Sequence, residues 1–434
     1  NISFLFLGDN QITKDLRLGY NLGANIMYQK YEVLGASTKN MLEKDNWIFN
    51  TGYQLTSASE NGHERSMYSV FGSLQLAFRE YLSLDLTARN DWSSTLPKKN
   101  NSFFYPSASL SWVFSDFMRS IDHKLPSWIT FAKLRVSAAQ VGKDPAPYNL
   151  YNVRKYQFEM GNRKPINNTI KLNANLKPEI KTSYEVGVDM KFLDNRLGFD
   201  FTYYYNTTKN QAMLVDASSP WTQQWVNAGK INNTGVEFML YGTPVKTRDF
   251  QFDITANLAH NSSTVKELAD GVNRVYFAGD SNMPVKVGAV KGGKLGDIFA
   301  NNLMQRDAQG RVIIGADGLP LAATGDGNLE QYLLDHPIGN IQPDLLMSIT
   351  PTFTYKGISL TAMFDMKFGG DIVSVSEGMA TSVGTSERTA YRGEYKTVNG
   401  VQDWYMVVPG VKADGSVNTQ EVSAQKYYST IGLY

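Results

Sequence analysis

Residues 81–91 read Tyr-Leu-Ser-Leu-Asp-Leu-Thr-Ala-Arg-Asn-Asp, and this order of residues sets the fold class. Successive side chains of a β-strand point to opposite faces, so the stretch predicts a strand with one apolar and one polar face. The apolar face carries Leu82, Leu84, Leu86 and Ala88, whereas the polar face carries Ser83, Asp85, Thr87, Arg89 and Asp91.

The same two-faced pattern recurs at 184–192, 197–205 and 252–258. A soluble sheet also alternates, but here each repeat is long and its second face is polar or charged. Such repeats are typical of strands that separate lipid from a watery lumen. The sequence therefore predicts an all-β, transmembrane wall of antiparallel strands.

The composition is compatible with such a wall. The chain has 434 residues, of which 42% are hydrophobic and 19% charged, and its net charge is +1. No stretch approaches the ~18 consecutive apolar residues of a membrane helix, but a spanning strand needs only ~9–11 residues. The low net charge argues against a polyanionic partner, so we expect no nucleic acid. With no cysteine, disulfide and thiolate chemistry are excluded for this chain.

The strand candidates are joined by short and long connections in alternation. Arg79-Glu80, Leu193-Asp194-Asn195 and Lys356-Gly357 are tight turns, whereas 33–65, 142–179, 211–229 and 263–294 are long. Outer-membrane barrels distribute periplasmic turns and extracellular loops in this way. The candidates are roughly 1–7, 14–32, 66–78, 81–91, 103–114, 129–141, 180–192, 196–210, 230–242, 250–262, 295–305, 344–355 and 358–369.

Aromatic residues on the apolar face gather at the tight-turn ends of the strands. Amphipathic rings favour the headgroup level of a membrane, so we interpret them as a girdle. Packing in the core of a sandwich is the alternative. The residues are Phe78, Trp112, Phe114, Phe192, Phe250 and Tyr355.

Two parts of the pattern are less regular. The runs 295–305 and 311–314 form either a spanning pair or a hairpin inside one large outer loop. After Phe368 the chain reads as loop-like. We therefore assign 1–370 to the barrel wall and 371–434 to an extracellular loop and the start of an unfinished remainder. No signal peptide precedes Asn1, so we expect a fragment or a processed piece, unfinished at both ends.

Six motifs follow one another between residues 89 and 343. They are Arg89-Asn90-Asp91-Trp92-Ser93-Ser94; Tyr105-Pro106-Ser107 with Ser109 and Trp112; Lys133-Leu134-Arg135-Val136-Ser137 with Gln140 and Gly142; Leu176-Lys177-Pro178-Glu179 with Glu185 and Gly187; Asn233-Thr234-Gly235-Val236-Glu237; and Ile338-Gly339-Asn340 with Pro343. Together they resemble the C-terminal half of a SusC/RagA-type TonB-dependent transporter, an outer-membrane nutrient importer of Bacteroidota. The sequence departs from the family at Ala139 and Trp92, where glycine is more frequent.

The resemblance implies a twenty-two-stranded barrel in the bacterial outer membrane, with short periplasmic turns and long extracellular loops. It also implies an N-terminal plug, a TonB box that receives energy from TonB, and a SusD-like lipoprotein lid. None of these three elements is visible in the sequence, so TonB would act through a missing N-terminal part. The implied function is uptake of oligosaccharides, with oligopeptide uptake of the RagA type as the near alternative.

Charged residues on the polar face have two interpretations. Paired carboxylates suit general acid–base catalysis, but opposite charges on neighbouring strands also form ladders, each exposed pair worth ~0–1 kcal/mol. We favour ladders. The four histidines, at 63, 123, 260 and 336, lack ligand-like spacing, so we predict no enzyme, metal or cofactor. Residues 326–330 offer alternate oxygen ligands, but Gln331 stands where a calcium loop needs glycine, and a polar turn is favoured over calcium.

Aromatic residues in the predicted extracellular loops are the candidate substrate contacts. Aromatic faces beside amides and carboxylates suit sugar rings, and also peptide side chains. Loop-on-loop packing, or contact with the lid, is the alternative. The candidates are Trp221 and Trp225 in 218–226; Tyr148, Tyr151 and Tyr156 in 142–179; and Trp92 with Arg89 and Asp91 at one strand end.

Two other classes of function are weighed against import. An outer-membrane barrel enzyme needs a compact His/Asp or Ser/His cluster near the outer rim, and the sequence supplies no such grouping. A soluble β-rich adhesin or sandwich requires Leu82, Leu84, Phe199 and Phe201 to face a protein core instead of lipid.

Overall fold

The structure is a computed structural model whose contacts divide the chain into two units. Unit 1 comprises residues 1–261, 269–271 and 347–365, and unit 2 comprises 262–268, 272–346 and 366–434. The backbone alone is described for 36–41, 52–60, 155–159, 162–166, 216, 278 and 330. The described residues are 1–41, 45, 52–123, 125–151, 155–159, 162–166, 169–278, 285–325 and 328–432.

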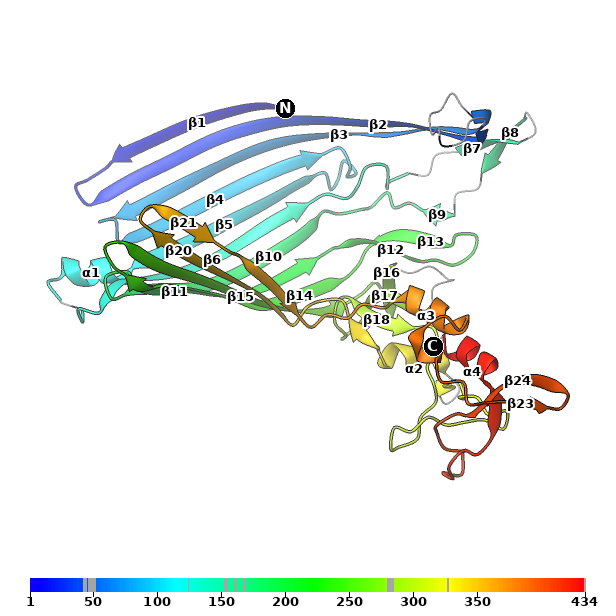
Figure 1. The fold of residues 1–434 in the computed structure, drawn as a ribbon. Coiled ribbons are helices and arrows are strands. Elements are labelled where there is room, and N and C mark those ends of the chain that lie inside the picture. Colours follow the sequence, from blue (N-terminus) through cyan, green and yellow to red (C-terminus); the bar gives the residue numbers. More distant parts are fainter. Residues whose placement is uncertain are drawn as a thin grey trace. The chain divides into compact units, whose positions relative to one another are not determined.

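One large antiparallel sheet runs through unit 1, and most of its strands lie beside the next strand in the chain (Figure 1). Its order is β1-β2-β3-β4-β5-β6-β10-β11-β14-β15-β20-β21, with β22 also paired to β20. This meander is the predicted wall. The strands are β1 (Ile2–Gln11), β2 (Leu16–Met41), β3 (Gly52–Phe78), β4 (Leu82–Ser93), β5 (Ser102–Val113), β6 (Ile129–Lys143), β10 (Glu179–Phe192), β11 (Leu197–Lys209), β14 (Lys230–Lys246), β15 (Phe250–Glu267), β20 (Leu345–Tyr355), β21 (Ile358–Thr361) and β22 (Phe364–Phe368).

The tight turns lie where the sequence predicts them. Arg79 and Glu80 both have positive φ, at 48° and 61°, and so do Lys356 and Gly357, at 45° and 86°. Two consecutive residues with positive φ give a turn whose twist matches the twist of the flanking strands. These turns fix the register between β3 and β4 and between β20 and β21.

The prediction of a long loop at 33–65 is wrong. β2 and β3 pair from Leu16 opposite Phe78 to Met41 opposite Gly52, with one shift of register between Ser37 and Thr38. In the sequence, residues 36–41 and 52–60 lack a regular alternation of apolar and polar residues, although the backbone ladder continues through them. Ladder hydrogen bonds use only backbone groups and do not require an apolar face.

The region between β15 and β20 forms no spanning pair among its described residues. β15 and β20 are neighbours in the large sheet, and the Phe252 and Phe353 rings stack at 4.7 Å. The predicted wall strand at 295–305 is therefore wrong, and so is the hairpin of 295–305 with 311–314, because β18 pairs with β17 and β19 and an isolated bridge from Arg306 to Val312 is what lies between the two runs. Instead, unit 2 contains a four-stranded sheet of β16 (Arg274–Ala278), β17 (Val285–Val290), β18 (Asp297–Ala300) and β19 (Gly339–Asn340).

The prediction of a loop-like chain after Phe368 is also wrong. Met406, Ala424 and Tyr428 are buried together, and so are Val408 and Val422 with two residues of the 314–319 turn. These side chains come from short elements whose periodicity is too brief to detect in the sequence. The elements are α2 (Leu329–Asp335), α3 (Val375–Ser382), a 3-10 turn (Glu387–Thr389), β23 (Glu394–Val398), β24 (Val401–Val407), β25 (Glu421–Ser423) and α4 (Ala424–Ile431).

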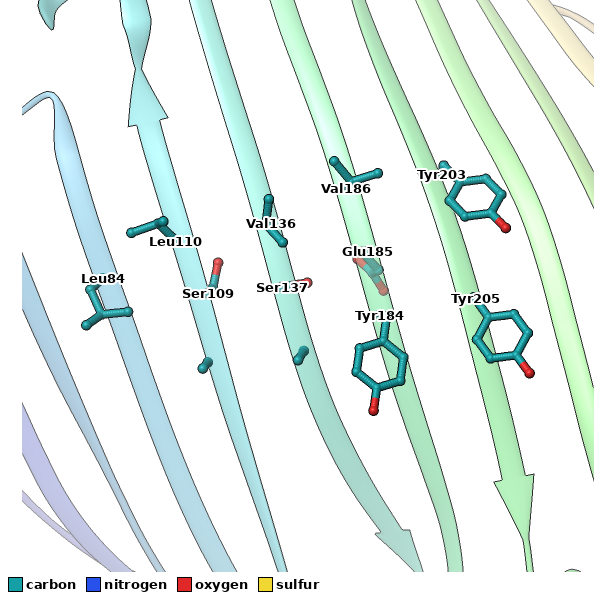
Figure 2. Close-up of a pocket in the computed structure, with 12 residues that line it drawn as sticks. Leu84, Ser109, Leu110, Val136, Ser137, Tyr184, Glu185, Val186, Tyr203 and Tyr205 are labelled. Atoms are coloured by element: carbon teal, nitrogen blue, oxygen red, sulfur yellow. The ribbon is translucent and has the colours of Figure 1, made fainter.

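The two faces of the large sheet differ as predicted. Figure 2 shows Leu84, Leu110, Val136 and Val186 on one face of four adjacent strands. The last three expose 44%, 47% and 37% of their surface, which is unusual for apolar side chains in the middle of a sheet.

Aromatic residues gather at the tight-turn ends, as the girdle interpretation requires. Trp112 packs edge-to-face against Phe114 at 5.2 Å, and Trp128 stacks on Phe192 at 5.7 Å. Phe114 begins the short helix α1 (Phe114–Ser120) and does not extend β5. Among the described residues, no helix has the length and hydropathy needed to cross a membrane.

Candidate functional site

Charged residues on the polar face of the sheet form cross-strand ladders. Arg135 of β6 reaches Asp200 of β11 through two hydrogen bonds of 2.5 and 2.7 Å, and Thr202 at 2.6 Å. The guanidinium passes over Gly187 of β10, where an added Cβ would lie 2.4 Å from Nε. The Asp200 carboxylate is held by this contact, so the arrangement is structural.

A second group of polar residues, here named the rim cluster, lies on the same face. It is at the end of β4 that is remote from the tight turn at Arg79 and Glu80. Asp91 is only 3% exposed and accepts hydrogen bonds from Arg89 Nε at 2.8 Å and Tyr105 Oη at 2.6 Å. Arg89 also donates to Ser69 Oγ at 3.0 Å, and its guanidinium lies 5.6 Å from the Phe71 ring centroid.

Asp144 extends the rim cluster from the end of β6. Its carboxylate accepts from Arg65 at 2.6 Å and from Thr95 at 2.8 Å, and Ser93 also donates to it. The Asp144 side chain is 6% exposed. These hydrogen bonds connect Arg65, the segment 93–95 and Asp144, which lie 28 to 79 residues apart in the sequence.

An apolar cluster supports the loops beside the rim cluster. Leu96, Phe103 and Leu176 are at most 5% exposed and pack with Tyr105 and Leu150. Phe103 and Tyr105 stack at 6.1 Å. The loop that carries Leu150 is thus anchored to β5.

The structure brings Arg89 and Asp91 together but separates Trp92 from them. Asp91 is opposite Ser69, whereas Trp92 is opposite Tyr68, on the apolar side of β4. Arg89 keeps 37% of its side chain exposed, so it is the member of this pair that a ligand can reach. Asp91 is buried and holds the Arg89 guanidinium.

Two of the candidate tyrosines are exposed. Tyr148 is 63% and Tyr151 65% exposed, and Tyr148 Oη accepts a hydrogen bond from the Glu64 backbone N–H at 2.9 Å. This bond ties the loop after β6 to β3. Tyr156 belongs to β7 (Lys155–Glu159), and its side chain lies outside the described residues.

One candidate tryptophan lies in a separate small sheet within unit 1, and the other lies just before it. Trp225 is in β13 (Gln223–Asn227), opposite Leu214 of β12 (Ala212–Asp216). Trp221 lies in the turn before β13, and both tryptophans are half-buried. β13 also pairs in parallel with β9 (Ile170–Lys171), so this sheet joins the two predicted extracellular loops.

Sequence reasoning did not identify Arg65, Thr95, Asp144 or Phe71. The contacts of Asp144 with Arg65 and Ser93 span 79 and 51 residues, and no local pattern reports a contact of that range. Tyr105 appeared only as part of a motif, although its hydroxyl holds Asp91.

The described residues contain no group of three or more His, Cys, Asp and Glu side chains suited to a metal. His63 stacks on Tyr31 at 5.1 Å and His336 on Tyr332 at 4.2 Å. Asp326 and Gly327 of the weighed calcium run lie outside the described residues, and Asn328 caps α2. The arrangement as a whole suits recognition of a polar ligand.

Comparison with known proteins identifies the family. The profile of the family described as "TonB dependent receptor-like, beta-barrel" matches residues 4–296. The chain belongs to this family. Its members are outer-membrane β-barrels, so the polar face of the sheet lines the lumen and the apolar face contacts lipid. The predicted fold class and outer-membrane location are thereby confirmed.

Curated relatives confirm the predicted type. The chain is 26% identical to TonB-dependent receptor SusC of Bacteroides thetaiotaomicron over 86% of its own length and 40% of that protein. It is 25% identical to TonB-dependent receptor P3 of Formosa agariphila over 72% of its length and 33% of that protein. The chain therefore spans well under half the length of these relatives, which are receptors and not enzymes.

Solved structures show the same fold. The RagAB peptide importer in its "closed-closed" state has a TM-score of 0.70 at 20% identity, covering 89% of this chain and 43% of that chain. Another RagAB structure, described as a peptide transporter, has a TM-score of 0.67.

Proposed function

We propose that this chain forms part of the wall of an active outer-membrane importer that takes up oligosaccharides with energy supplied through TonB. The lumen face provides the wetted wall, and the loops above it provide the ligand contacts. A SusD-like lipoprotein would cover the loops, and TonB would act through a part of the protein outside this chain.

The observation that carries the proposal is the wall itself. Along β10 the apolar face runs from Tyr184 to Phe192, eight residue steps or about 27 Å. This agrees with the ~25 Å apolar band of outer-membrane barrels. The lumen side of the same strand bears Glu185, Asp189 and Lys191, which suit a hydrated passage.

Oligosaccharide is the favoured cargo because of the groups at the loop end of the wall. Trp221 and Trp225 offer aromatic faces, and Arg89 and Tyr148 offer polar groups that remain exposed. Sugar rings pack on aromatic faces while their hydroxyls bond to charged and amide groups.

Oligopeptide uptake is the second candidate. The Arg89 guanidinium lies beside the Phe71 ring, donates to Asp91 and Ser69, and has further N–H groups that could bind a carboxylate such as a peptide C-terminus. The RagAB structures, described as a peptide importer, share the fold.

Ligand titration of the full-length receptor distinguishes these functions. Isothermal titration calorimetry with a panel of oligosaccharides and a panel of oligopeptides should detect binding of oligosaccharides. In the double variant Trp221→Ala, Trp225→Ala, the free energy of oligosaccharide binding should be weaker by about 1–3 kcal/mol. Trp128→Ala, at the tight-turn end, is the matched control and should bind normally. Binding of peptides alone would favour the second candidate, and unchanged affinity of the double variant would remove both tryptophans as contacts.

A further inference from the structure

The hairpin of β23 and β24 in unit 2 carries two exposed aromatic side chains, here named the aromatic pair (Figure 1). Tyr395 is directly opposite Trp404, and their ring centroids lie 5.4 Å apart with the ring planes tilted by 55°. The two residues are 56% and 40% exposed. Large rings that are grouped and exposed in this way indicate a contact surface for a ligand or partner.

The two faces of this hairpin differ in what their side chains contact. On one face Lys396 pairs with Glu421 of β25 at 2.6 Å, so its charge has a partner within the sheet. The aromatic pair lies on the other face, because neighbouring residues of a strand point to opposite sides. Thr397 and Gln402, the next opposed pair on that face, are also exposed. A hydroxyl and an amide therefore lie beside the two rings.

A cavity of about 740 Å³ adjoins the aromatic pair. It reaches Met406, which is two residues beyond Trp404 on the same face of β24, or about 7 Å along the strand. Its volume is within the range of small-ligand sites. The cavity lies within unit 2, and its walls combine apolar and polar side chains. They include Met304, Met406, Ile431, Glu377, Thr381 and Arg388.

The polar side chains of the cavity are incompletely partnered among the described residues. Thr381 is only 2% exposed, and its Oγ1 has no hydrogen-bond partner there. Ser386 Oγ donates to the Glu377 carboxylate and accepts from the Arg388 backbone N–H at 3.1 Å, which keeps these two charged residues close. Within the described part of the chain, Glu377 and Arg388 form no ion pair with each other. A buried hydroxyl of this kind needs a hydrogen-bond partner from elsewhere.

This set of groups suits a neutral sugar better than an ion. A sugar hydroxyl can donate to the Glu377 carboxylate and also accept from the Arg388 guanidinium. An anion would be repelled by Glu377, and a cation would be repelled by Arg388. The aromatic pair adds a flat apolar surface of the kind that packs against a sugar ring.

We propose that the aromatic pair and the adjoining cavity bind a neutral oligosaccharide, with one sugar ring over Trp404 and further units in the cavity. This second site is separate from Trp221 and Trp225 of unit 1, and it lies largely outside the residues 4–296 that match the family profile. The proposal rests on the proposed function, because it assigns another contact for the same class of cargo.

Fluorine NMR of the full-length receptor labelled with fluorotryptophan tests the site directly. The resonance of Trp404 is assigned by its loss in Trp404→Phe. It should shift when a panel of neutral hexasaccharides of glucose, xylose and mannose includes one that the receptor binds. The resonance of Trp128, at the tight-turn end of the large sheet, is the control and should not move.

Isothermal titration calorimetry with the same panel measures the contribution of each group. Trp404→Ala should weaken oligosaccharide binding about tenfold, whereas Trp404→Phe keeps a ring and should retain most of the affinity. Thr381→Val and Arg388→Gln each remove a hydrogen-bonding group and should weaken binding about fivefold. Phe277→Ala and Lys412→Gln alter exposed residues of unit 2 outside the site, and both should bind as the unaltered receptor does. Equal resistance of unit 2 to limited proteolysis verifies that the variants are folded.

The outcomes separate this site from the proposed function. Oligosaccharide binding without a shift at Trp404, or with unchanged affinity in Trp404→Ala, would overturn the second site and leave the proposed function intact. If no oligosaccharide binds, both proposals fail. A shift of the Trp404 resonance with oligopeptides alone would contradict the assignment of the ligand.

Discussion

The two faces of the large sheet share one backbone but are stabilised in different ways. On the lipid face Leu110, Val136 and Val186 are more than a third exposed within the protein. On the lumen face Asp91 pairs with Arg89 of its own strand, and Arg135 pairs with Asp200 across strands. The lipid on one side of the sheet and the water on the other decide which side chains each face carries. A shared hydrophobic core between the faces plays no part. Backbone hydrogen bonds hold the wall together where no water is present.

The largest expected effect comes from a charge on the lipid face. Leu84→Arg should impair assembly of the full-length receptor by about 2–4 kcal/mol, because the side chain lies near the middle of the apolar band. Folded yield in liposomes, measured by heat-modifiable migration, checks the prediction.

Thr87→Arg is the matched control, since it adds the same side chain to the lumen face of the same strand. It should be tolerated much better. Equal folded yields for the two variants would contradict the assignment of the faces.

A smaller loss is expected within the rim cluster. Asp91→Ala removes the acceptor of Arg89 Nε and Tyr105 Oη, and Arg89 keeps its hydrogen bond to Ser69. The free energy of unfolding should fall by about 1–3 kcal/mol. Urea unfolding of the full-length receptor in lipid vesicles measures this free energy. The control is Asp85→Ala, because Asp85 is a more accessible carboxylate on the same strand and face, and its loss should lower the free energy of unfolding by less. A cost for Asp91→Ala no greater than for Asp85→Ala would show that the cluster adds no stability.

The smallest effect tests the ladder that crosses Gly187. Gly187→Ala displaces the Arg135 guanidinium from its path to Asp200, and the half-exposed pair is worth about 0.2–1 kcal/mol. Gly19→Ala is the control, because its Cβ would meet Gln75 at an ordinary 3.6 Å. If both variants unfold at the same urea concentration, the ladder contributes nothing measurable.

The sequence predicts the wall well because period-two alternation is a local property. The stretch 81–91 identifies both faces of β4, and the turns at Arg79 and Lys356 are visible as short breaks between alternating runs. The alternation within 81–91 also predicts that Arg89 and Asp91 lie together, because residues two apart in a strand share a face.

Other features depend on contacts that no local pattern encodes. Residues 36–41 and 52–60, which extend β2 and β3, lack a regular alternation of apolar and polar residues, so the sequence gives no strand signal there. Asp144 follows β6 and meets Arg65 of β3, although β4 and β5 lie between these two strands in the sheet, so the contact exists only in the folded sheet. The compact elements after Phe368 rest on small buried groups such as Met406 and Tyr428, drawn from segments too short to show a period.

The central claim, that alternate residues of one strand face lipid and lumen, is tested most directly along β10. Single cysteines at Val186, Val188, Glu185 and Asp189, in a cysteine-free full-length receptor, can each carry a fluorophore in liposomes that contain a nitroxide-labelled lipid. The account predicts strong quenching at 186 and 188 and weak quenching at 185 and 189. Equal quenching at all four positions, or the reverse order, would contradict it.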